Sequence, residues 1–292
     1  MKTTETIGEI LFENNMPLIK MWNVSVTPGQ RPYWKHSHTR FEITVVASGG
    51  GEYTTANGVY EMKKGDVFVF SSNEEHCITK VSDEGLTITN LHFEPRYLEK
   101  TASSEKDSFI ELCFSHSDKF KNRIPSAKAE FIRACHDNIR QEFIKKEREY
   151  EVSIRANLNL LIINLLRQHN YEAHETYDKK SNLKNILSVF DYIDNNFSEN
   201  LTLNELAEVA GLTPNYLSFL FKKLNGISLW DYITAKRTEK AAALIVSGGS
   251  QTFLDIATEC GFNNTANFNK AFKKHKGLTP SELKKNPKRL YH

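Results

Sequence analysis

Two histidines and a glutamate stand close together near the start of the 292-residue chain, in the stretch HSHTRFE. His36 and His38 are one residue apart, and Glu42 follows four residues after His38. Because alternate side chains of an extended strand point to one face, all three would share a face of such a strand. Imidazole nitrogens and a carboxylate suit a borderline divalent metal ion, and they can also hydrogen-bond a small polar ligand. The spacing therefore predicts a metal site or an effector site, provided that this face lines an interior.

Short β-type runs surround this motif and would position it. They cover residues 41–47, 51–55, 67–70, 76–79 and 86–93, with an Asn57-Gly58 turn between two of them. Short strands at this spacing are typical of a small antiparallel barrel or sandwich. His76 begins a later run and could bring a fourth side chain to the same interior. A lone histidine there would more often be a hydrogen-bonded core residue, so the prediction rests on the four residues together.

Two helical stretches follow the strands. Ser126 is a candidate N-cap for the first, whose apolar stripe is Phe131, Cys135, Ile139 and Phe143. The stripe of the second is Tyr150, Ile154, Leu158, Leu161, Ile162 and Leu165. This second stripe is longer than covering a small barrel requires, which favours a homodimer formed through the helices between 126 and 169. The alternative is that the whole stripe belongs to the core of one chain.

Length, charge and cysteine usage bound the class of protein. A chain of this length exceeds one comfortable core, so two domains are expected. Residues 183–292 hold 14 Lys and Arg against 10 Asp and Glu, whereas residues 1–182 hold 24 against 26, so the C-terminal third is the basic part. No signal pattern or membrane-spanning run is evident, which predicts a cytoplasmic protein without a membrane partner. Four scattered cysteines without a CxxC pair indicate reduced thiols.

The C-terminal part contains an internal repeat of about 50 residues. Its copies, Leu206 to Ser228 and Ile256 to Thr279, read LAEVAGLTPNYLSFLFKKLNGIS and IATECGFNNTANFNKAFKKHKGLT. Gly211 aligns with Gly261 at an offset of 50 and Phe221 with Phe272 at 51, so one residue is inserted in the second turn. A small residue, a turn glycine and a second helix ending in basic residues are the parts of a helix-turn-helix. One copy could be an ordinary helical hairpin, but two copies that share the small residue, the turn glycine and the basic ending favour a DNA-binding domain.

Two such units in one rigid domain can place their second helices in successive major grooves, about 34 Å apart. The residues expected at base edges are Asn215, Ser218 and Phe219 in the first helix and Thr265, Asn267, Asn269 and Lys270 in the second. The residues expected at phosphates are Lys222, Lys223, Lys273, Lys274 and Lys276. Double-stranded promoter DNA is the partner that these residues imply.

The C-terminal 110 or so residues resemble the AraC/XylS family of bacterial transcription regulators, whose DNA-binding domain joins two helix-turn-helix units by a long helix. The stretch GFNNTANFNKAFKKHKGLTP matches the family's most specific segment. The resemblance implies a joining helix at Leu229 to Val246, with a packing side of Trp230, Ile233, Arg237, Ala241 and Leu244. Phe219 departs from the arginine that the family commonly has, which favours weaker readout or apolar contact with thymine methyls.

The N-terminal part resembles the cupin domain that family members often use to sense small molecules. His36, His38, Glu42 and Gly49 stand at cupin spacings, and Gly65-Asp66 and His76 follow. Ser71, Asn73 and Lys80 depart from the second cupin motif. The predicted fold class is α+β with two domains, the first a cupin-like antiparallel β-barrel (a double-stranded β-helix) with helices, the second all-α. The predicted divisions are a barrel at 1–125, a dimerisation segment at 126–170, a linker at 171–182 and a DNA-binding domain at 183–292.

Three functions are compatible with this organisation. The favoured one is a ligand-responsive transcription regulator without enzymatic activity, whose effector is a sugar or another carbon-source metabolite bound by His36, His38, Glu42 and His76. A divalent transition metal held by the same four residues is a possible cofactor, and RNA polymerase is a further partner if the regulator is an activator. The second is a metal-dependent cupin enzyme fused to a DNA-binding domain. The third is a DNA-binding protein whose barrel only mediates dimerisation.

Overall fold

The computed structural model describes residues 2–11, 17–29, 36–55, 57–72, 74–94, 97–98, 120–169, 179–225 and 227–286. The chain forms two compact units. The N-terminal unit comprises Met1–Trp34 and Arg40–Glu175, and the C-terminal unit comprises Lys35–Thr39 and Thr176–His292. Most of the predicted linker at 171–182 lies outside the described residues, and its last four residues already belong to a helix that begins at Lys179.

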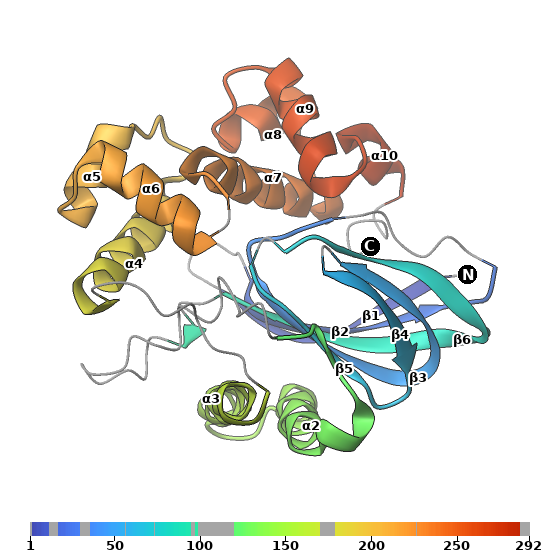
Figure 1. Ribbon diagram of the computed structural model, residues 1–292. Coiled ribbons are helices and arrows are strands. Elements are labelled where there is room, and N and C mark those ends of the chain that lie inside the picture. Colours follow the sequence, from blue (N-terminus) through green and yellow to red (C-terminus); the bar gives the residue numbers. More distant parts are fainter. Residues whose placement is uncertain are drawn as a thin grey trace. The chain divides into compact units, whose positions relative to one another are not determined.

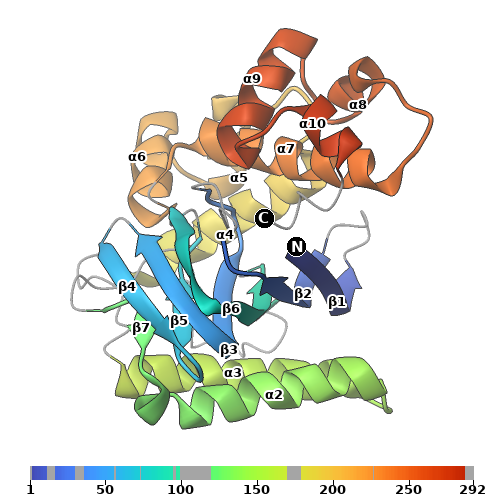
Figure 2. The same cartoon turned by 90° about the vertical axis from the view of Figure 1, so that its right-hand side faces the viewer.

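The N-terminal unit is built on one antiparallel sheet (Figures 1 and 2). Its strands are β1 (Lys2–Leu11), β2 (Pro17–Val26), β3 (Phe41–Thr55), β4 (Gly58–Lys63), β5 (Val67–Phe70), β6 (His76–Phe93) and β7 (Arg123–Ile124). The hydrogen-bonded order is β1-β2-β6-β3-β5-β7, and β4 pairs with the second half of β3. This confirms a cupin-like sheet, but no pairing among the described strands closes it into a barrel.

Each of the two longest strands includes two of the short runs that the sequence predicts. Residues 41–47 and 51–55 both belong to β3, and residues 76–79 and 86–93 both belong to β6. β3 and β6 pair along most of their lengths, with register shifts near Gly49 and Tyr53. These irregularities let a long strand bend where the sequence suggests a break.

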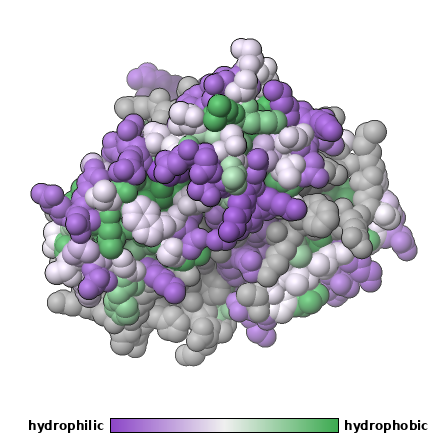
Figure 3. Space-filling model, turned by 90° about the horizontal axis from the view of Figure 1, so that it is seen from above, coloured by the Kyte–Doolittle hydropathy of each residue, from purple (hydrophilic) through white to green (hydrophobic). Residues whose placement is uncertain are grey.

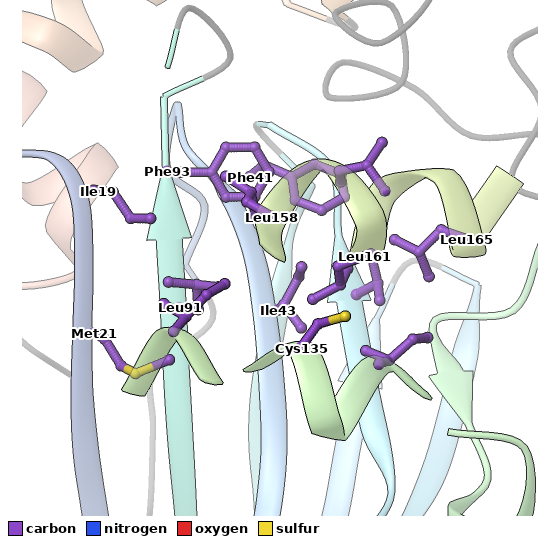
Figure 4. Close-up of a cluster of buried hydrophobic side chains, with 14 of the residues drawn as sticks. Ile19, Met21, Phe41, Ile43, Leu91, Phe93, Cys135, Leu158, Leu161 and Leu165 are labelled. Atoms are coloured by element: carbon purple, nitrogen blue, oxygen red, sulfur yellow. The ribbon is translucent and has the colours of Figure 1, made fainter. Parts of the chain in front are cut away.

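Side chains on one face of the sheet meet two helices, α2 (Glu130–Lys145) and α3 (Tyr150–Gln168). The helices lie side by side along the sheet (Figures 1 and 2). Figure 4 shows the shared core, to which the strands contribute Ile19, Met21, Phe41, Ile43, Leu91 and Phe93 and the helices contribute Cys135, Leu158, Leu161 and Leu165. The predicted stripe from Ile154 to Leu165 is therefore buried, as expected.

Two predictions about these helices need correction. The stripe on α3 packs wholly within its own unit, so its length is not evidence for a subunit interface. The first helix begins at Glu130, after a short 3-10 turn at Ser126–Lys128, so Ser126 is not its N-cap. Its inward stripe starts at Ile132, whereas Phe131 is 47% exposed.

From Lys179 onward, the described residues of the C-terminal unit form helices and the connections between them. Its helices are α4 (Lys179–Asn196), α5 (Leu203–Ala210), α6 (Pro214–Asn225), α7 (Leu229–Ser247), α8 (Phe253–Glu259), α9 (Thr265–Lys276) and α10 (Pro280–Lys285). The pairs α5–α6 and α8–α9 are the two predicted helix-turn-helix units, and α7 lies between them (Figure 1). The joining helix thus has nearly its predicted bounds.

Helix α7 is buried around most of its circumference rather than along one side. Ile233 and Ala241 are buried as predicted, but Trp230 is 45% exposed. Several polar side chains of α7 are also buried, and one of them, Lys236, is paired with α4. The ammonium of Lys236 lies 3.0 Å from the carboxylate of Asp194 on α4, and each side chain is only 4% exposed. A buried charge of this kind is tolerated because it is paired.

The neighbouring basic residue of α7 fixes the loop after α4. Arg237 donates from Nε to the carbonyl of Phe197 at 2.6 Å and from Nη2 to the carbonyl of Glu199 at 2.8 Å. The turn of the second helix-turn-helix approaches the same loop, because a Cβ on Gly261 would lie 2.4 Å from the carbonyl oxygen of Ser198. One loop therefore contacts both the joining helix and the second unit.

Other features of the described residues bear on the class of protein. No helix among them combines the length and the apolar character needed to cross a membrane. Cys77, Cys135 and Cys260 are free and buried, as predicted, and Cys113 lies outside the described residues.

We expect Gly261→Ala to destabilise the chain more than Gly211→Ala. Both glycines have left-handed backbones, with φ of 81° and 62°, which costs about 1–2 kcal/mol for other residues. Only Gly261 faces a close backbone atom, whereas nothing lies within 4 Å of a Cβ at Gly211. Urea unfolding of the two variants would measure the difference. Equal losses of unfolding free energy would mean that the loop at Ser198 moves away freely.

Candidate nucleic-acid interface and interior polar cluster

In the first helix-turn-helix, helix caps and an aromatic core fix the position of α6. Thr202 and Glu205 form a capping box at the start of α5, and Gly211 ends that helix in the left-handed conformation. In α6, Phe221 is buried against Phe190 and Tyr232, with ring centroids 5.1 and 5.5 Å away. Leu217 and Leu220 are buried on the same side. On the opposite side of α6, Asn215 and Phe219 are exposed.

The second unit repeats this construction. The side chain of Asn264 caps α9 by accepting from the backbone N–H of Asn267 at 2.7 Å. Phe268 and Phe272 are fully buried, with their rings 5.6 Å apart. The three residues between Gly261 and α9 outnumber the two between Gly211 and α6, which confirms the single inserted residue.

The predicted DNA-contacting residues lie on the outward sides of these two helices. Those that are exposed are Asn215, Phe219, Lys222, Thr265, Asn267, Asn269, Lys270, Lys273 and Lys274, and Ser218 is half-buried. Lys276 is also half-buried, and the side chain of Lys223 lies outside the description. Figure 3 shows a face on which hydrophilic residues predominate and hydrophobic atoms gather in separate groups. Exposure permits contact with DNA, and the roles of these residues stay predictions.

One of the predicted phosphate ligands already has an acidic partner. The ammonium of Lys274 lies 2.7 Å from a carboxylate oxygen of Asp231, near the start of α7. Asp231 also accepts from the hydroxyl of Ser228 at 2.7 Å. The hydrogen bonds from Lys274 and Ser228 hold the pKa of Asp231 below its usual value. Lys273 and Lys274 are adjacent in sequence but differ in their electrostatic surroundings.

A second candidate site lies on the face of the sheet that points away from α2 and α3. Glu42 on β3 pairs in register with His92 on β6, and Thr44 pairs with Asn90. A carboxylate oxygen of Glu42 lies 2.8 Å from Nε2 of His92 and 3.2 Å from Nε2 of His76. The hydroxyl of Thr44 donates to the other oxygen of Glu42 at 2.5 Å and lies 3.0 Å from the amide oxygen of Asn90. We call these five residues the interior polar cluster.

Aromatic rings surround the interior polar cluster. Trp22 contacts His92 edge to face at a centroid distance of 4.5 Å, and Phe70 stacks on His76 at 4.1 Å. His76 also bonds through Nδ1 to the carbonyl of Glu74 at 2.9 Å. Burial disfavours the charged ring of His76, but the carboxylate of Glu42 together with the carbonyl and carboxylate of Glu74 outweighs burial, so the pKa of His76 is raised. The cluster thus combines a buried carboxylate with imidazole and aromatic groups.

The predicted set of four ligands is only partly assembled within one unit. Glu42 and His76 meet in the N-terminal unit, as the sequence predicts. His36 and His38 belong to the short segment Lys35–Thr39, which groups with the C-terminal unit. Their rings lie 6.0 Å apart, and His38 is buried. The joint role of the four residues therefore stays a prediction.

Three members of the cluster are not among the predicted residues, namely Thr44, Asn90 and His92. The sequence could have identified them through the alternation of even- and odd-numbered residues between the two faces of a sheet. On both paired strands the even-numbered residues face the cluster, whereas Phe41, Ile43, Leu91 and Phe93 face the helices. Had the runs at 41–47 and 86–93 been paired in this register, Asn90 and His92 would have fallen opposite Thr44 and Glu42.

The interior polar cluster has two chemical uses. Hydroxyl, amide, imidazole and carboxylate groups beside aromatic rings can hydrogen-bond and stack against a small polar molecule. Two imidazoles and a carboxylate are also ligands that a divalent transition metal accepts.

Comparison with protein families gives a match for each part of the chain. A model described as a helix-turn-helix domain matches residues 206–286, which include both helix-turn-helix units. A model described as an AraC-like ligand binding domain matches residues 26–147, which include Glu42, Thr44, His76, Asn90 and His92.

Among curated proteins, the chain is 24% identical over 245 residues to an uncharacterized HTH-type transcriptional regulator of Staphylococcus aureus. That match covers 83% of the chain but only 31% of the relative, so the chain spans about a third of that protein's length. The melibiose operon regulatory protein of Escherichia coli is 23% identical over 263 residues, with 86% of the chain and 83% of the relative covered.

Among solved structures, the chain is similar in fold to ToxT from Vibrio cholerae. The TM-score is 0.64 at 13% sequence identity, with 91% of the chain and 97% of ToxT covered. Another structure of ToxT contains a bound unsaturated fatty acid, and its TM-score is 0.57 at 12% identity, with 97% of the chain and 94% of ToxT covered. At these identities the likeness shows the fold alone.

We expect Lys273→Ala to reduce the salt dependence of duplex DNA binding more than Lys274→Ala does. Each phosphate contact that is lost lowers the slope of log affinity against log salt by about 0.9. Lys274 should contribute less, because Asp231 partly neutralises it. Fluorescence anisotropy of the full chain over a salt series would measure both slopes.

The matched control is Asp231→Asn, which should raise DNA affinity by releasing Lys274. Equal changes of slope in the two lysine variants would show instead that Lys274 leaves Asp231 when DNA binds.

Proposed function

The chain belongs to the AraC/XylS family of transcription regulators, and on that premise we propose that it regulates promoters by binding duplex DNA in response to a small molecule. The observation that carries the proposal is the pair of exposed recognition faces on α6 and α9, each anchored by buried aromatic residues. A DNA-bound regulator of this kind acts in the cytoplasm. Where it activates, RNA polymerase is its further partner.

The salt series above tests this proposal. Association that neutralises phosphates releases counterions, so affinity must fall as salt rises. An affinity of the full chain for duplex DNA that is independent of salt would contradict the proposal, whichever lysine variant is used.

We propose that the effector binds at the interior polar cluster and is a sugar or a related polyhydroxyl metabolite. Thr44, Asn90 and the imidazoles can exchange hydrogen bonds with hydroxyl groups, and Trp22 and Phe70 can cover apolar ring faces. The buried carboxylate of Glu42 would repel the carboxylate of a fatty acid, the ligand named for ToxT. The melibiose operon regulator among the relatives also favours a carbohydrate and a role in carbon-source metabolism.

A divalent metal is a second occupant that we propose for the same region. Glu42 and His76 would hold it together with His36 and His38, and it would supply a positive centre to which ligand oxygens can bind. The residues fit this purpose by their chemistry, since Glu42 offers a carboxylate and the three histidines offer imidazole nitrogens. The side chains of Glu42 and His76 are almost fully buried. The same metal would be required if the chain were a cupin enzyme, but the relatives are regulators, which favours sensing over turnover.

One set of purified proteins tests both occupants. Elemental analysis should find stoichiometric metal in the wild type and none in a His36→Ala, His38→Ala variant. In thermal unfolding, one member of a panel of mono- and disaccharides should raise the Tm of the wild type, whereas an unsaturated fatty acid should not. Asn90→Leu should abolish the shift, because it removes a hydrogen-bonding group of the cluster.

Asn195→Leu is the matched control, since Asn195 is exposed on α4, away from the interior polar cluster in sequence. A fatty acid that raises the Tm while sugars do not would overturn the carbohydrate proposal. Metal that is retained by the double-histidine variant would place any metal site elsewhere.

We also propose that the regulator is a homodimer formed through the outward side of α2 and α3. The buried stripe cannot serve, but Phe131, Ile144, Val152 and Leu160 are 47, 55, 59 and 49% exposed on these helices. Between them, the amide of Asn138 donates to the side chain of Asn157 at 3.1 Å. Symmetric dimers are the commonest closed assembly, and an apolar face of this kind suits a second copy.

Leu160→Asp should shift the full chain from dimer to monomer, because a carboxylate would be buried without a partner in the interface. Val59→Asp is the control, since Val59 is 62% exposed on β4 and away from the helices. Sedimentation velocity at micromolar concentration would compare the two variants. A wild type that sediments only as a monomer would refute the dimer.

A further inference from the structure

The first recognition helix presents an aromatic ring where the second presents a positive charge. The buried anchors Leu217 and Phe221 in α6 correspond to Phe268 and Phe272 in α9, at a constant offset of 51 residues. At the same offset, Phe219 corresponds to Lys270. Both residues are exposed, and they lie on the sides of their helices that face away from the buried anchors. Equivalent backbone positions therefore carry opposite chemistries.

The ring of Phe219 is held in place rather than folded into the core. Its side chain is 51% exposed, and it stacks on Tyr216 with centroids 6.4 Å apart and planes 29° from parallel. Leu217, Leu220 and Phe221 already fill the inward side of α6. Phe219 thus exposes an apolar surface on the helix that is proposed to enter the major groove.

The chemistry of the groove limits what such a ring can recognise. Thymine presents an apolar C5-methyl group there, whereas guanine presents two acceptors that an ammonium can satisfy. A phenyl ring has no donor, so a guanine beneath it would lose water from its acceptors without compensation. The ring instead gains free energy by covering a methyl group.

On the basis of the proposed DNA-binding function, we infer that the two recognition helices read different base chemistry. Phe219, supported by Tyr216, recognises the C5-methyl group of a pyrimidine in the half-site bound by α6. Lys270 and Asn269 recognise purine edges in the half-site bound by α9. The operator is therefore asymmetric, and its orientation fixes which unit binds which half-site.

Thymidine and deoxyuridine differ only by the methyl group, which allows a direct test. The full chain would first select its preferred sequence from a pool of random duplexes. Each thymine of that sequence would then be replaced singly by deoxyuridine, and affinities would be measured at one salt concentration. We expect a loss of about fourfold at one or two thymines of a single half-site, the factor expected for one buried methyl group. Replacing the same thymine by 5-methylcytosine, with guanine opposite it, should preserve more affinity than cytosine does.

Three variants assign the effect to the ring. Phe219→Ala should bind thymine and deoxyuridine duplexes equally, and Phe219→Leu should keep part of the discrimination because leucine still covers a methyl group. Lys270→Ala should leave the discrimination unchanged and relax selectivity in the other half-site. Phe219 is exposed, so these substitutions leave the core of α6 intact.

The outcomes separate this inference from the function on which it rests. Wild-type protein that binds thymine and deoxyuridine duplexes equally would overturn the aromatic readout while leaving DNA binding intact. Discrimination that survives in Phe219→Ala would also overturn it. Failure of the full chain to bind any duplex in a salt-dependent way would overturn the proposed function itself.

Discussion

The two hydrogen bonds from Arg237 to the loop after α4 are the constraint on which the C-terminal unit depends. They join the middle of α7 to the segment from which the first helix-turn-helix begins. The second unit approaches the same loop through Gly261, where no side chain could fit. Helix α7 also contributes Ala241 and Ala242 to the core of the second unit. A single helix and a single loop therefore set how the two recognition helices are placed relative to one another.

Such rigidity matters because DNA fixes the distance between successive major grooves. Two recognition helices that moved independently would lose conformational freedom on binding, and the loss would oppose affinity. Polar groups at this junction are buried in pairs, as with Lys236 and Asp194, and a pair of this kind favours one arrangement more strictly than apolar contact does. The same rigidity lets two recognition helices of equal length present different side chains, such as Phe219 and Lys270, at corresponding positions.

In the N-terminal unit, the alternation of strand side chains separates packing from recognition. Phe41 and Ile43 of β3 and Leu91 and Phe93 of β6 pack against α2 and α3, whereas their sequence neighbours Glu42, Thr44, Asn90 and His92 lie on the opposite face. The helices therefore stabilise the sheet without occupying the polar face. A substitution on one face changes stability, and one on the other changes the interior polar cluster, although the residues are adjacent in sequence.

The sequence by itself determined the features that depend on near neighbours in the chain. Helix caps such as Asn264, turn glycines such as Gly211, and the spacing of buried anchors act within a few residues, so both helix-turn-helix units and the stripe on α3 could be predicted. The stripe predicted for α2 repeats at every fourth residue. Because successive helical side chains point about 100° apart, such a series drifts around the helix, so Phe131 lies outside the buried face and Ile132 lies on it. Local pattern specifies a face only when the repeat follows the helical period.

Tertiary structure alone decided which distant residues meet. His92 reaches Glu42 across 50 residues only because β6 pairs with β3 in one register, and Lys274 reaches Asp231 across 43 residues only because α9 packs on α7. It also decided that the stripe on α3 faces its own sheet, since an amphipathic pattern shows that a face is buried and not what covers it. Contacts between elements depend on the way in which several faces pack together at once. No single segment of the sequence carries that information.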